Sequence, residues 1–360
     1  MSRILHVDTA RTWRGGQNQV LLTALGMASL GHDVTLACRE GGALEPSALA
    51  AGIRVRPLPF RGDLWPPAAR GLAAVLRAER PDVAQLHDPH AVSAGLLARR
   101  LGGTRVPLVA TRRVDFPLKG FLSRAKYSAC ERVIAVSTAI REVLVQDGLP
   151  AERLRLVHEG VRDRAPETGG RDALLELGVP EGSPVIGNVA ALTDHKDHAT
   201  LLEAAALVVK ARPDVRFVIL GEGEKRAHLL GLRRQLGLED HVIFAGFRHD
   251  LDRLLPAFDV FCLSSHQEGL GTSLLDAMVF ARPIVATRAG GIPDAVEDGV
   301  TGHLVPVRDA GALGGALLAL LADPARREEM GALGRQRFVE HFTAELMVEN
   351  TLRVYAEMRG

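Results

Sequence analysis

Short apolar runs alternate with longer amphipathic stretches along most of the chain. The runs are rich in β-branched side chains, which is typical of strands buried on both faces of a parallel sheet. The stretches between them are long enough for helices that cover such a sheet, so we expect an α/β protein. The pattern predicts strands at residues 4–7, 34–37, 55–58, 83–86, 108–111, 133–136, 154–157, 185–189, 217–220, 242–244, 260–263 and 284–287.

This alternation occurs twice, with a break at residues 158–172 (HEGVRDRAPETGGRD), which have no apolar periodicity. The break predicts an N-terminal domain at 1–160 and a C-terminal domain at 161–342, each doubly wound and Rossmann-like. A final helix within 343–360, about as far as Arg359, is expected to pack back on the N-terminal domain. In doubly wound sheets, ligands bind at the carboxyl ends of the strands.

The composition is that of a globular protein, with 47% hydrophobic and 24% charged residues in a length of 360. No apolar run approaches the ~18 residues that span a bilayer, and no export signal is apparent, so we expect a cytoplasmic location. Cys38, Cys130 and Cys262 lie on or beside apolar runs without metal-ligand spacing, which predicts buried, inert thiols.

Charge is divided unevenly along the chain. Residues 1–160 contain 22 Lys and Arg against 14 Asp and Glu, whereas residues 161–360 contain 22 against 29. The basic half is the half suited to an anionic acceptor or an anionic membrane surface, although compositional drift in an arginine-rich chain explains the asymmetry equally well.

The stretch at residues 260–287 (VFCLSSHQEGLGTSLLDAMVFARPIVAT) predicts a strand, a loop with two glycines, a helix from Thr272 and another strand. The free N–H groups and the positive dipole at a helix start bind phosphate. Asp276, one turn into the helix, is placed to accept hydrogen bonds from ribose hydroxyls, and Glu268 precedes the phosphate position, where a sugar would project. From these residues alone, an ordinary turn with Thr272 as helix cap and Glu268 solvated is the alternative.

The sequence EGLGTSLLDAMVFARPIVATRAGGIPDAVEDGVTGHLV resembles the C-terminal signature of the GT-B, family-4 type retaining glycosyltransferases, also called glycosyl transferases group 1. Its hallmark is two acidic residues separated by seven, here Glu268 and Asp276. The resemblance covers nearly the whole chain, including IGNVAALTDHKDHATLLEAA, FVILGEGEKR and VIFAGF. It implies a GT-B fold, in which two Rossmann-like doubly wound domains face each other across a cleft.

The resemblance also implies roles for individual residues. Lys196 is implied to neutralise the donor diphosphate, backbone groups around Gly246 and Phe247 to hold the base, and His87 to face the transferring sugar. Without the resemblance, a solvated lysine and an ordinary hydrogen-bonded histidine are the simpler interpretations. The implied catalytic residues are Glu268, His87 and Lys196, and the implied donor-binding residues are Gly15, Gly16, Gly246, Phe247, Gly269, Leu270, Gly271, Thr272 and Asp276.

Two further residues and two departures complete the expected site. Arg112 and Arg113 follow a strand and are expected to face the cleft and contact the acceptor or a donor phosphate. Many relatives have Glu at the position of Asp276, so the ribose must be reached by a shorter side chain. Many also have Arg at the position of Ala191, and its absence removes a bidentate phosphate donor. These departures affect donor affinity more than the type of reaction.

The resemblance implies transfer of a hexose-type sugar, with retention, from a nucleotide diphosphate sugar to an envelope glycolipid, polysaccharide or small-molecule acceptor. Neither a metal nor another cofactor is expected, because the Asp250-Leu251-Asp252 pair precedes a helix and is more simply explained as a cap. The basic half suits peripheral association with the inner face of a membrane, and no nucleic-acid motif is present. The alternatives are a sugar-nucleotide epimerase of the same fold and a non-catalytic two-lobed sugar-nucleotide binding protein.

Overall fold

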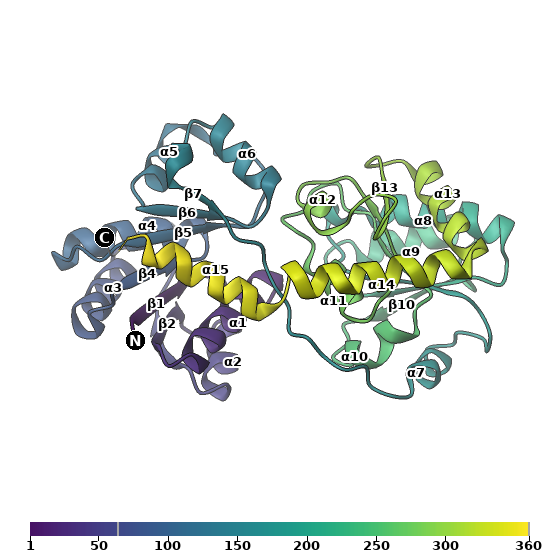
Figure 1. Ribbon diagram of the computed structural model, residues 1–360, viewed down its shortest axis with the longest axis horizontal. Helices are drawn as coiled ribbons and strands as arrows, with labels where there is room; N and C mark the ends of the chain where they lie inside the picture. Colours follow the sequence, from purple (N-terminus) through teal and green to yellow (C-terminus); the bar gives the residue numbers. More distant parts are fainter. Residues whose placement is uncertain (63–64, 359–360) are drawn as a thin grey trace. The chain divides into compact units, whose positions relative to one another are not determined.

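The computed structural model describes residues 1–62 and 65–358, which form two compact units (Figure 1). Unit 1 contains Met1–Val161 together with the chain from Thr343 onward, and unit 2 contains Arg162–Phe342. Arg359, where the final helix was expected to end, lies outside the described residues.

Unit 1 is built on one sheet of seven parallel strands, in the order β3-β2-β1-β4-β5-β6-β7. The strands are β1 (Arg3–Asp8), β2 (Asp33–Arg39), β3 (Arg54–Leu58), β4 (Val83–Leu86), β5 (Leu108–Arg112), β6 (Arg132–Ala135) and β7 (Leu154–Leu156). Its helices are α1 (Gly15–Ser29), α2 (Leu44–Ala50), α3 (Pro66–Glu79), α4 (Pro89–Gly102), α5 (Gly120–Ser128), α6 (Thr138–Gln146), the 3-10 turn η1 (Ala151–Arg153) and α15 (Ala344–Ala356).

Unit 2 is built on a second sheet of six parallel strands, in the order β10-β9-β8-β11-β12-β13. The strands are β8 (Val185–Val189), β9 (Arg216–Leu220), β10 (Val242–Gly246), β11 (Val260–Leu263), β12 (Ile284–Thr287) and β13 (Gly302–Val305). Its helices are α7 (Gly170–Glu176), η2 (Asp194–Lys196), α8 (His198–Ala211), α9 (Arg226–Gln235), α10 (Leu251–Leu254), η3 (Leu255–Ala257), α11 (Thr272–Val279), α12 (Ile292–Ala295), α13 (Ala310–Ala322) and α14 (Pro324–His341).

All twelve strands expected from the apolar runs are confirmed, with ends that differ by at most two residues. The sequence pattern missed β13, because its four residues, GHLV, include a glycine and a histidine and lack a clear apolar run. Cys38, Cys130 and Cys262 are buried and free, as expected. Burial raises the pKa of the Cys38 and Cys130 thiols to about 12, which makes both unreactive.

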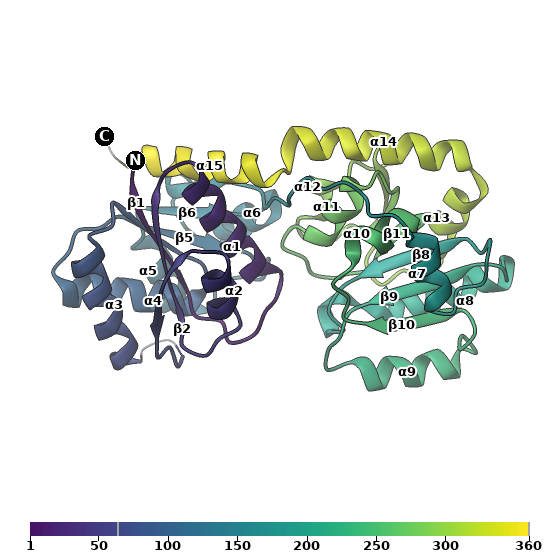
Figure 2. The same cartoon turned by 90° about the horizontal axis from the view of Figure 1, so that it is seen from below.

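The sheet of unit 1 has an apolar core on each face. Alternate strand residues such as Leu5 and Leu86 pack toward α3 and α4, while Ile4 and Val83 pack toward α1, α2 and α15. Helix α15 packs against α1 (Figure 2), and it comes so close that a Cβ on Gly26 would lie 2.6 Å from Val348. Helix α15 is thus part of the core of unit 1.

Each sheet reverses its strand order once, at β1/β4 in unit 1 and at β8/β11 in unit 2. At such a point the connections leave on opposite faces, so the carboxyl ends of the two strands border a crevice where ligands of doubly wound sheets bind. Strand β1 ends at Asp8 and β4 is followed by His87, whereas β11 is followed by the serines of the 264–271 loop. Most of the expected site residues therefore lie at these two reversal points.

Candidate active site

The two expected charges of unit 2, Lys196 and Glu268, form an ion pair. Lys196 ends the short η2 turn after β8, and Glu268 lies in the loop between β11 and α11. Their side chains are only 16% and 12% exposed, so the alternative of a solvated Glu268 is wrong. The structure brings together two residues that are far apart in sequence, at the reversal point of the sheet.

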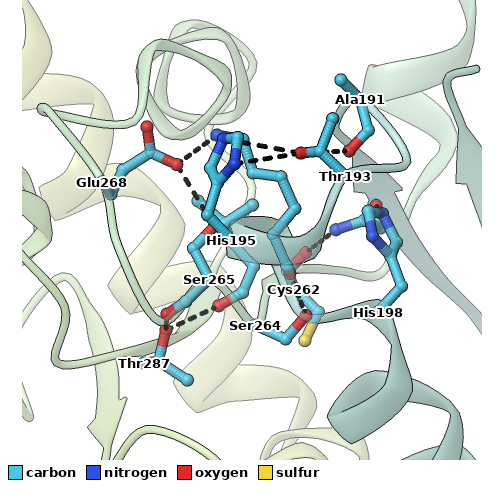
Figure 3. Close-up of polar contacts among 12 residues, drawn as sticks. Ala191, Thr193, His195, His198, Cys262, Ser264, Ser265, Glu268 and Thr287 are labelled. Carbon is cyan, nitrogen blue, oxygen red and sulfur yellow. Dashed lines mark hydrogen bonds and ion pairs between the residues drawn. The ribbon is translucent and has the colours of Figure 1, made fainter. Parts of the chain in front are cut away.

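Hydrogen bonds fix the loop that contains Glu268 (Figure 3). Ser265 Oγ lies 3.2 Å from Glu268 Oε2 and donates to it, and Thr287 Oγ1 donates to the carbonyl oxygen of Ser265. The backbone N–H of Gly291 donates to the Glu268 carbonyl oxygen at 3.1 Å. The loop is thereby attached to β12 and to the turn before α12, and the Glu268 carboxylate has a defined direction.

The turn that contains Lys196 is fixed in the same way. Ser264 Oγ donates to the Lys196 carbonyl oxygen at 3.0 Å. Asn188 Nδ2 donates to the Cys262 carbonyl oxygen at 2.9 Å. Asn188 Oδ1 lies 3.1 Å from Nε2 of His198, which Figure 3 labels, and this nitrogen must therefore donate. Burial lowers the pKa of His198 to about 4, so its ring is neutral. This buried network links β8, β11 and the start of α8.

Helix α11 begins directly after the glutamate loop. Its N-cap position is Gly271, whose φ of 86° is a left-handed conformation that glycine adopts without strain, and no side chain caps the helix. The alternative of Thr272 as cap is therefore wrong, because Thr272 is the first helical residue. With Gly269 and buried Leu270 in the preceding turn, the first N–H groups of α11 stay available for an anion, as phosphate binding requires.

Asp276 has a protein partner at the position expected for ribose contact. Arg164 Nη2 lies 2.6 Å from Asp276 Oδ1, and Arg164 Nε lies 2.9 Å from Asp252 Oδ1. Burial raises the pKa of Asp276, and the charge of Arg164 opposes that shift. The guanidinium also lies over the Phe280 ring, with its carbon 5.7 Å from the ring centroid. Whether Asp276 also contacts ribose stays a prediction.

The residues expected to hold the base lie at the end of β10. Gly246 has a φ of 70°, and its carbonyl oxygen accepts from the N–H of Gly221 at 2.8 Å. A Cβ on Gly246 would lie 3.1 Å from Glu222 Oε1, so a larger residue would crowd the turn. Phe247 is 62% exposed, and its ring meets the His249 ring edge-on, with the two ring centroids 4.9 Å apart. This exposed aromatic pair is a surface on which a base can stack.

The acidic pair at 250 and 252 is bound by arginines. Asp250 occupies the expected N-cap position of α10, but its side chain makes no capping hydrogen bond and forms a bidentate ion pair with Arg248 at 2.8 and 2.6 Å. Asp252 is the partner of Arg164. Among residues 1–62 and 65–358, no group of three or more His, Cys, Asp or Glu side chains is placed to hold a metal ion.

In unit 1, His87 is part of a buried chain of polar groups. His87 Nε2 lies 2.9 Å from His6 Nδ1, and the two rings are stacked with centroids 5.1 Å apart. On its other side, His87 Nδ1 lies 3.2 Å from Arg113 Nη2, and Arg113 Nε donates to Glu159 at 2.8 Å. The chain therefore runs from Glu159 through Arg113 and His87 to His6.

The hydrogen bonds assign the tautomers of both histidines. Burial, aided by the positive charge of Arg113, lowers the pKa of His87 well below its usual range and that of His6 to about 3, so both rings are neutral. Arg113 can only donate, so His87 Nδ1 accepts and its proton lies on Nε2. That proton is donated to His6 Nδ1, which leaves the His6 proton on Nε2. This buried N–H has no partner in the described chain.

Gly15 and Gly16 begin α1, beside the same site. A Cβ on Gly16 would lie 3.7 Å from Arg113 Cδ, so the first turn of the helix lies beside the arginine. Gln17, in that turn, donates to Asp8 Oδ2 at 3.1 Å. Burial and the neighbouring charge of Asp88 raise the pKa of Asp8, a largely buried carboxyl at the end of β1, to about 6. No motif in the sequence singled out Asp8.

Arg112 and Arg113 are placed differently from each other. Arg113 contacts His87, whereas the buried Arg112 donates from Nη2 to the Phe116 carbonyl oxygen at 2.7 Å. Its guanidinium carbon lies 4.9 Å from the centroid of the Phe116 ring and 5.8 Å from that of Tyr127. Arg112 thus shapes the loop after β5, and a phosphate contact by either arginine stays a prediction.

His6, Glu159 and Arg164 contact residues of the expected site, and none of the three was predicted from the sequence. His6 lies in a strand that was correctly predicted, and only the adjacency of β1 and β4 shows that it meets His87. Glu159 and Arg164 lie in the 158–172 stretch, which was interpreted as a linker. The charges of that stretch were the available signal, because a pure linker has no need of ion pairs.

The comparisons with known proteins identify the family of the chain. The family "Glycosyl transferases group 1" matches residues 175–337, and "Glycosyltransferase Family 4" matches residues 13–164. D-inositol 3-phosphate glycosyltransferase of Saccharomonospora viridis is 30% identical over 394 aligned positions that cover 96% of this chain and 91% of the relative. The chain belongs to the family-4 type glycosyltransferases. It is therefore a glycosyltransferase.

A second relative and a solved structure are also similar to this chain. Alpha-maltose-1-phosphate synthase of Mycolicibacterium smegmatis is 31% identical to this glycosyltransferase, and the match covers 80% of this chain and 82% of the relative. The crystal structure of Anabaena Alr3699/HepE in complex with UDP-glucose superposes with a TM-score of 0.88 at 21% identity, and the match covers 99% of this chain and all of that one. This likeness shows that the fold is GT-B. No helix in the described part of the glycosyltransferase is long and apolar enough to cross a bilayer.

Proposed function

We propose that this glycosyltransferase moves a hexose-type sugar from a nucleotide diphosphate sugar to an acceptor with retention of configuration and without a metal ion. The observation that carries the proposal is the Lys196–Glu268 ion pair next to the uncapped start of α11. A cation, a carboxylate and free N–H groups meet there, and these are the groups that a diphosphate-linked sugar needs.

In this proposal the donor replaces the ion pair. Lys196 moves from the Glu268 carboxylate to the diphosphate, and Glu268 then accepts hydrogen bonds from sugar hydroxyls. The diphosphate lies on the turn formed by Gly269, Leu270, Gly271 and Thr272. Complexes of the structurally similar HepE with UDP and with UDP-glucose support such a donor.

Further donor contacts follow from the same placement. The base stacks near Gly246 and Phe247, and the ribose hydroxyls compete with Arg164 for Asp276. Arg164 must share the Asp276 carboxylate with the ribose, and the aspartate side chain is shorter than the glutamate of many relatives; both features weaken donor binding. The absence of an arginine at Ala191 weakens it further, because a phosphate contact is missing. Gly15 and Gly16 at the start of α1 approach the phosphates.

Catalysis arises from charge stabilisation in this proposal. Negative charge accumulates on the leaving diphosphate, where Lys196 and the positive end of α11 stabilise it without reorganisation. The acceptor attacks the face from which the diphosphate leaves, and the leaving oxygen takes the acceptor proton, so no strong protein base is needed. His87 faces the transferring sugar, and Arg112 and Arg113 are the proposed contacts for the acceptor. The occupied acidic pair at 250 and 252 supports a metal-independent reaction.

The acceptor is proposed to be an envelope glycolipid, a polysaccharide precursor or a small molecule. The names of the relatives point to different compounds, D-inositol 3-phosphate in one case and alpha-maltose 1-phosphate in another. The excess of 22 basic over 14 acidic residues in the first 160 favours an anionic acceptor. We also propose a cytoplasmic protein that associates peripherally with the inner face of the membrane.

Product stereochemistry tests the proposal. The protein is incubated with a nucleotide diphosphate sugar and a panel of acceptors, and the anomeric configuration of the product is determined by NMR. We expect the donor configuration to be retained and Glu268→Gln to reduce turnover at least tenfold. Inversion of configuration would contradict retention, and formation of an epimer without an acceptor would show a sugar-nucleotide epimerase instead.

A further inference from the structure

The start of α5 exposes large apolar side chains to solvent. Phe121 is 75% exposed and Leu122 is 82% exposed, more than any other large apolar side chain described after Met1. Phe116, in the loop just before the helix, is 43% exposed. Single exposed apolar residues are common on protein surfaces, but three within seven positions form a patch that calls for a partner.

Contacts with the rest of unit 1 hold this segment firmly. Leu118 is buried, and its N–H donates to Asp147 Oδ2 at 2.6 Å. At the other end, Tyr127 is buried and Lys126 Nζ donates to the Pro89 carbonyl oxygen on α4 at 2.9 Å. With both ends fixed, the exposure of Phe121 and Leu122 is imposed by the fold rather than by a loose loop.

The helix is amphipathic with its apolar side outward. Residues four apart lie on the same side of a helix, so Phe121 and Ala125 share one side and Leu122 lies next to them. The buried Tyr127 lies on the opposite side, against the sheet. In a helix of a globular protein the apolar side normally faces the core, and here it faces away.

Positive charges surround the apolar side chains. Residues 116–128 (FPLKGFLSRAKYS) contain Lys119, Arg124 and Lys126 and no acidic residue. Lys119 and Arg124 are both exposed to solvent. Large apolar side chains flanked by cations of this kind match a bilayer with anionic headgroups, where the apolar groups enter the acyl boundary and the cations meet phosphates.

The patch is also connected to the candidate site. Arg112, at the end of β5, donates to the Phe116 carbonyl oxygen at 2.7 Å and lies against its ring. The next residue, Arg113, contacts His87. The segment thus leads directly from the site residues to the exposed start of α5, which Figure 1 shows at one end of unit 1, near α6.

We propose that residues 116–126 form a docking surface for an anionic lipid bilayer, in which Phe121 and Leu122 insert and Lys119 and Arg124 bind headgroup phosphates. The surface holds the carboxyl end of β4 and β5 near the membrane. This surface deepens the peripheral membrane association proposed above and rests on it, whereas the proposed donor chemistry does not depend on docking.

Sedimentation with vesicles tests this surface. The full chain is mixed at about 0.05 M and 0.15 M salt with neutral phosphatidylcholine vesicles and with vesicles containing phosphatidylglycerol. We expect binding to the anionic vesicles that weakens as salt screens the cations, and little binding to neutral vesicles. The double variant F121S/L122S should bind anionic vesicles at least tenfold more weakly, because two large apolar groups no longer leave water.

Matched variants separate docking from general effects. L49S/L101S changes two leucines on the same unit that are 55% and 50% exposed, and it should bind like the unchanged protein. K119A/R124A should lose most of the preference for anionic over neutral vesicles. Each variant is used only if its melting temperature matches that of the unchanged protein.

Three results would overturn the docking surface: no binding to anionic vesicles, equal binding to both vesicle types, or unchanged binding of F121S/L122S. A dimer that dissociates in F121S/L122S, without vesicle binding by the unchanged protein, would show that a second copy covers the patch. Thermal stabilisation by the donor is measured in parallel for the unchanged protein and for each variant. If the donor stabilises none of them, the result counts against the proposed donor and not against docking.

Discussion

Arg113 donates twice to His87: Nη1 lies 3.0 Å from the carbonyl oxygen of His87, and Nη2 lies 3.2 Å from its ring Nδ1. One guanidinium therefore fixes both the backbone and the ring of the histidine, and Glu159 fixes the guanidinium in turn. Since an arginine cannot accept a hydrogen bond, this arrangement decides which ring nitrogen of His87 has the proton.

Replacing Glu159 with glutamine should loosen this arrangement. The amide of Glu159→Gln still accepts a hydrogen bond but no longer balances the charge of Arg113, so the His87 ring loses its fixed position. We expect kcat to fall about 10- to 100-fold, because small displacements at a reacting centre lower the rate by such factors, while KM for the donor changes little. In the unchanged protein, 15N NMR should show the proton of both His6 and His87 on Nε2, and in E159Q the His87 signal should broaden or shift.

The control is E131Q, which weakens another arginine pair of unit 1, that of Arg99 and Glu131 at 2.8 Å. It should leave kcat and the histidine spectrum unchanged. A His87 proton on Nδ1 in the unchanged protein would contradict the tautomer assignment.

The buried His6 should make the protein sensitive to acid. Its pKa is about 3 in the folded state and near 6.5 in the unfolded state, so only the unfolded state takes up this proton in between. The contribution of neutral His6 to the free energy of unfolding is fully present above pH ~6.5 and is lost as the pH decreases toward 3. In H6Q, the slope of unfolding free energy against pH between ~5.5 and ~4 should be smaller by about 1.4 kcal/mol per pH unit.

Urea unfolding at several pH values measures that slope. The matched control, H228Q, changes an exposed histidine of α9 and should leave the slope unchanged. An unchanged slope in H6Q would show that His6 is already protonated in the folded protein near pH ~5.

The Arg164–Asp276 pair allows a test by double substitution. R164A leaves the Asp276 carboxylate largely buried without its cation, and we expect a loss of about 2–3 kcal/mol of stability, slightly less than for a fully buried pair. D276N in the R164A background should recover part of the loss, because the unpaired charge is gone. Strictly additive effects in thermal unfolding would mean that the two side chains do not interact.

Much of this protein could be predicted from its sequence, because strand burial and helix start signals are local. The apolar runs predicted twelve strands, and the spacing of Glu268 and Asp276 located the loop and helix of unit 2. The contacts of Lys196 with Glu268 and of His6 with His87 depend on which strands become neighbours, and strand order is not encoded in any local pattern. For the same reason Arg164, in an apparent linker, gave no sign that it would pair with Asp276.

Metal independence can be tested by chelation. Asp250 and Asp252 form ion pairs with Arg248 and Arg164, so this Asp-x-Asp pair is not free to bind a divalent cation. Excess chelator should therefore leave turnover within about twofold of its initial value. The measurement is donor consumption with and without EDTA after dialysis against chelator. Loss of turnover that added Mg²⁺ or Mn²⁺ restores would contradict the expectation.

Donor-induced stabilisation tests the central claim most directly, namely that Lys196, Glu268 and the start of α11 form the donor site. At a nucleotide diphosphate sugar concentration of about 100 times its Kd, the unchanged protein should gain about 2.7 kcal/mol of stability in a thermal-shift assay. K196A should lose most of this gain, whereas K225A, which removes a more exposed lysine paired with Asp194, should keep it. Equal stabilisation of K196A and the unchanged protein by the same donor, or no stabilisation by any donor of a UDP- and GDP-sugar panel, would contradict the account.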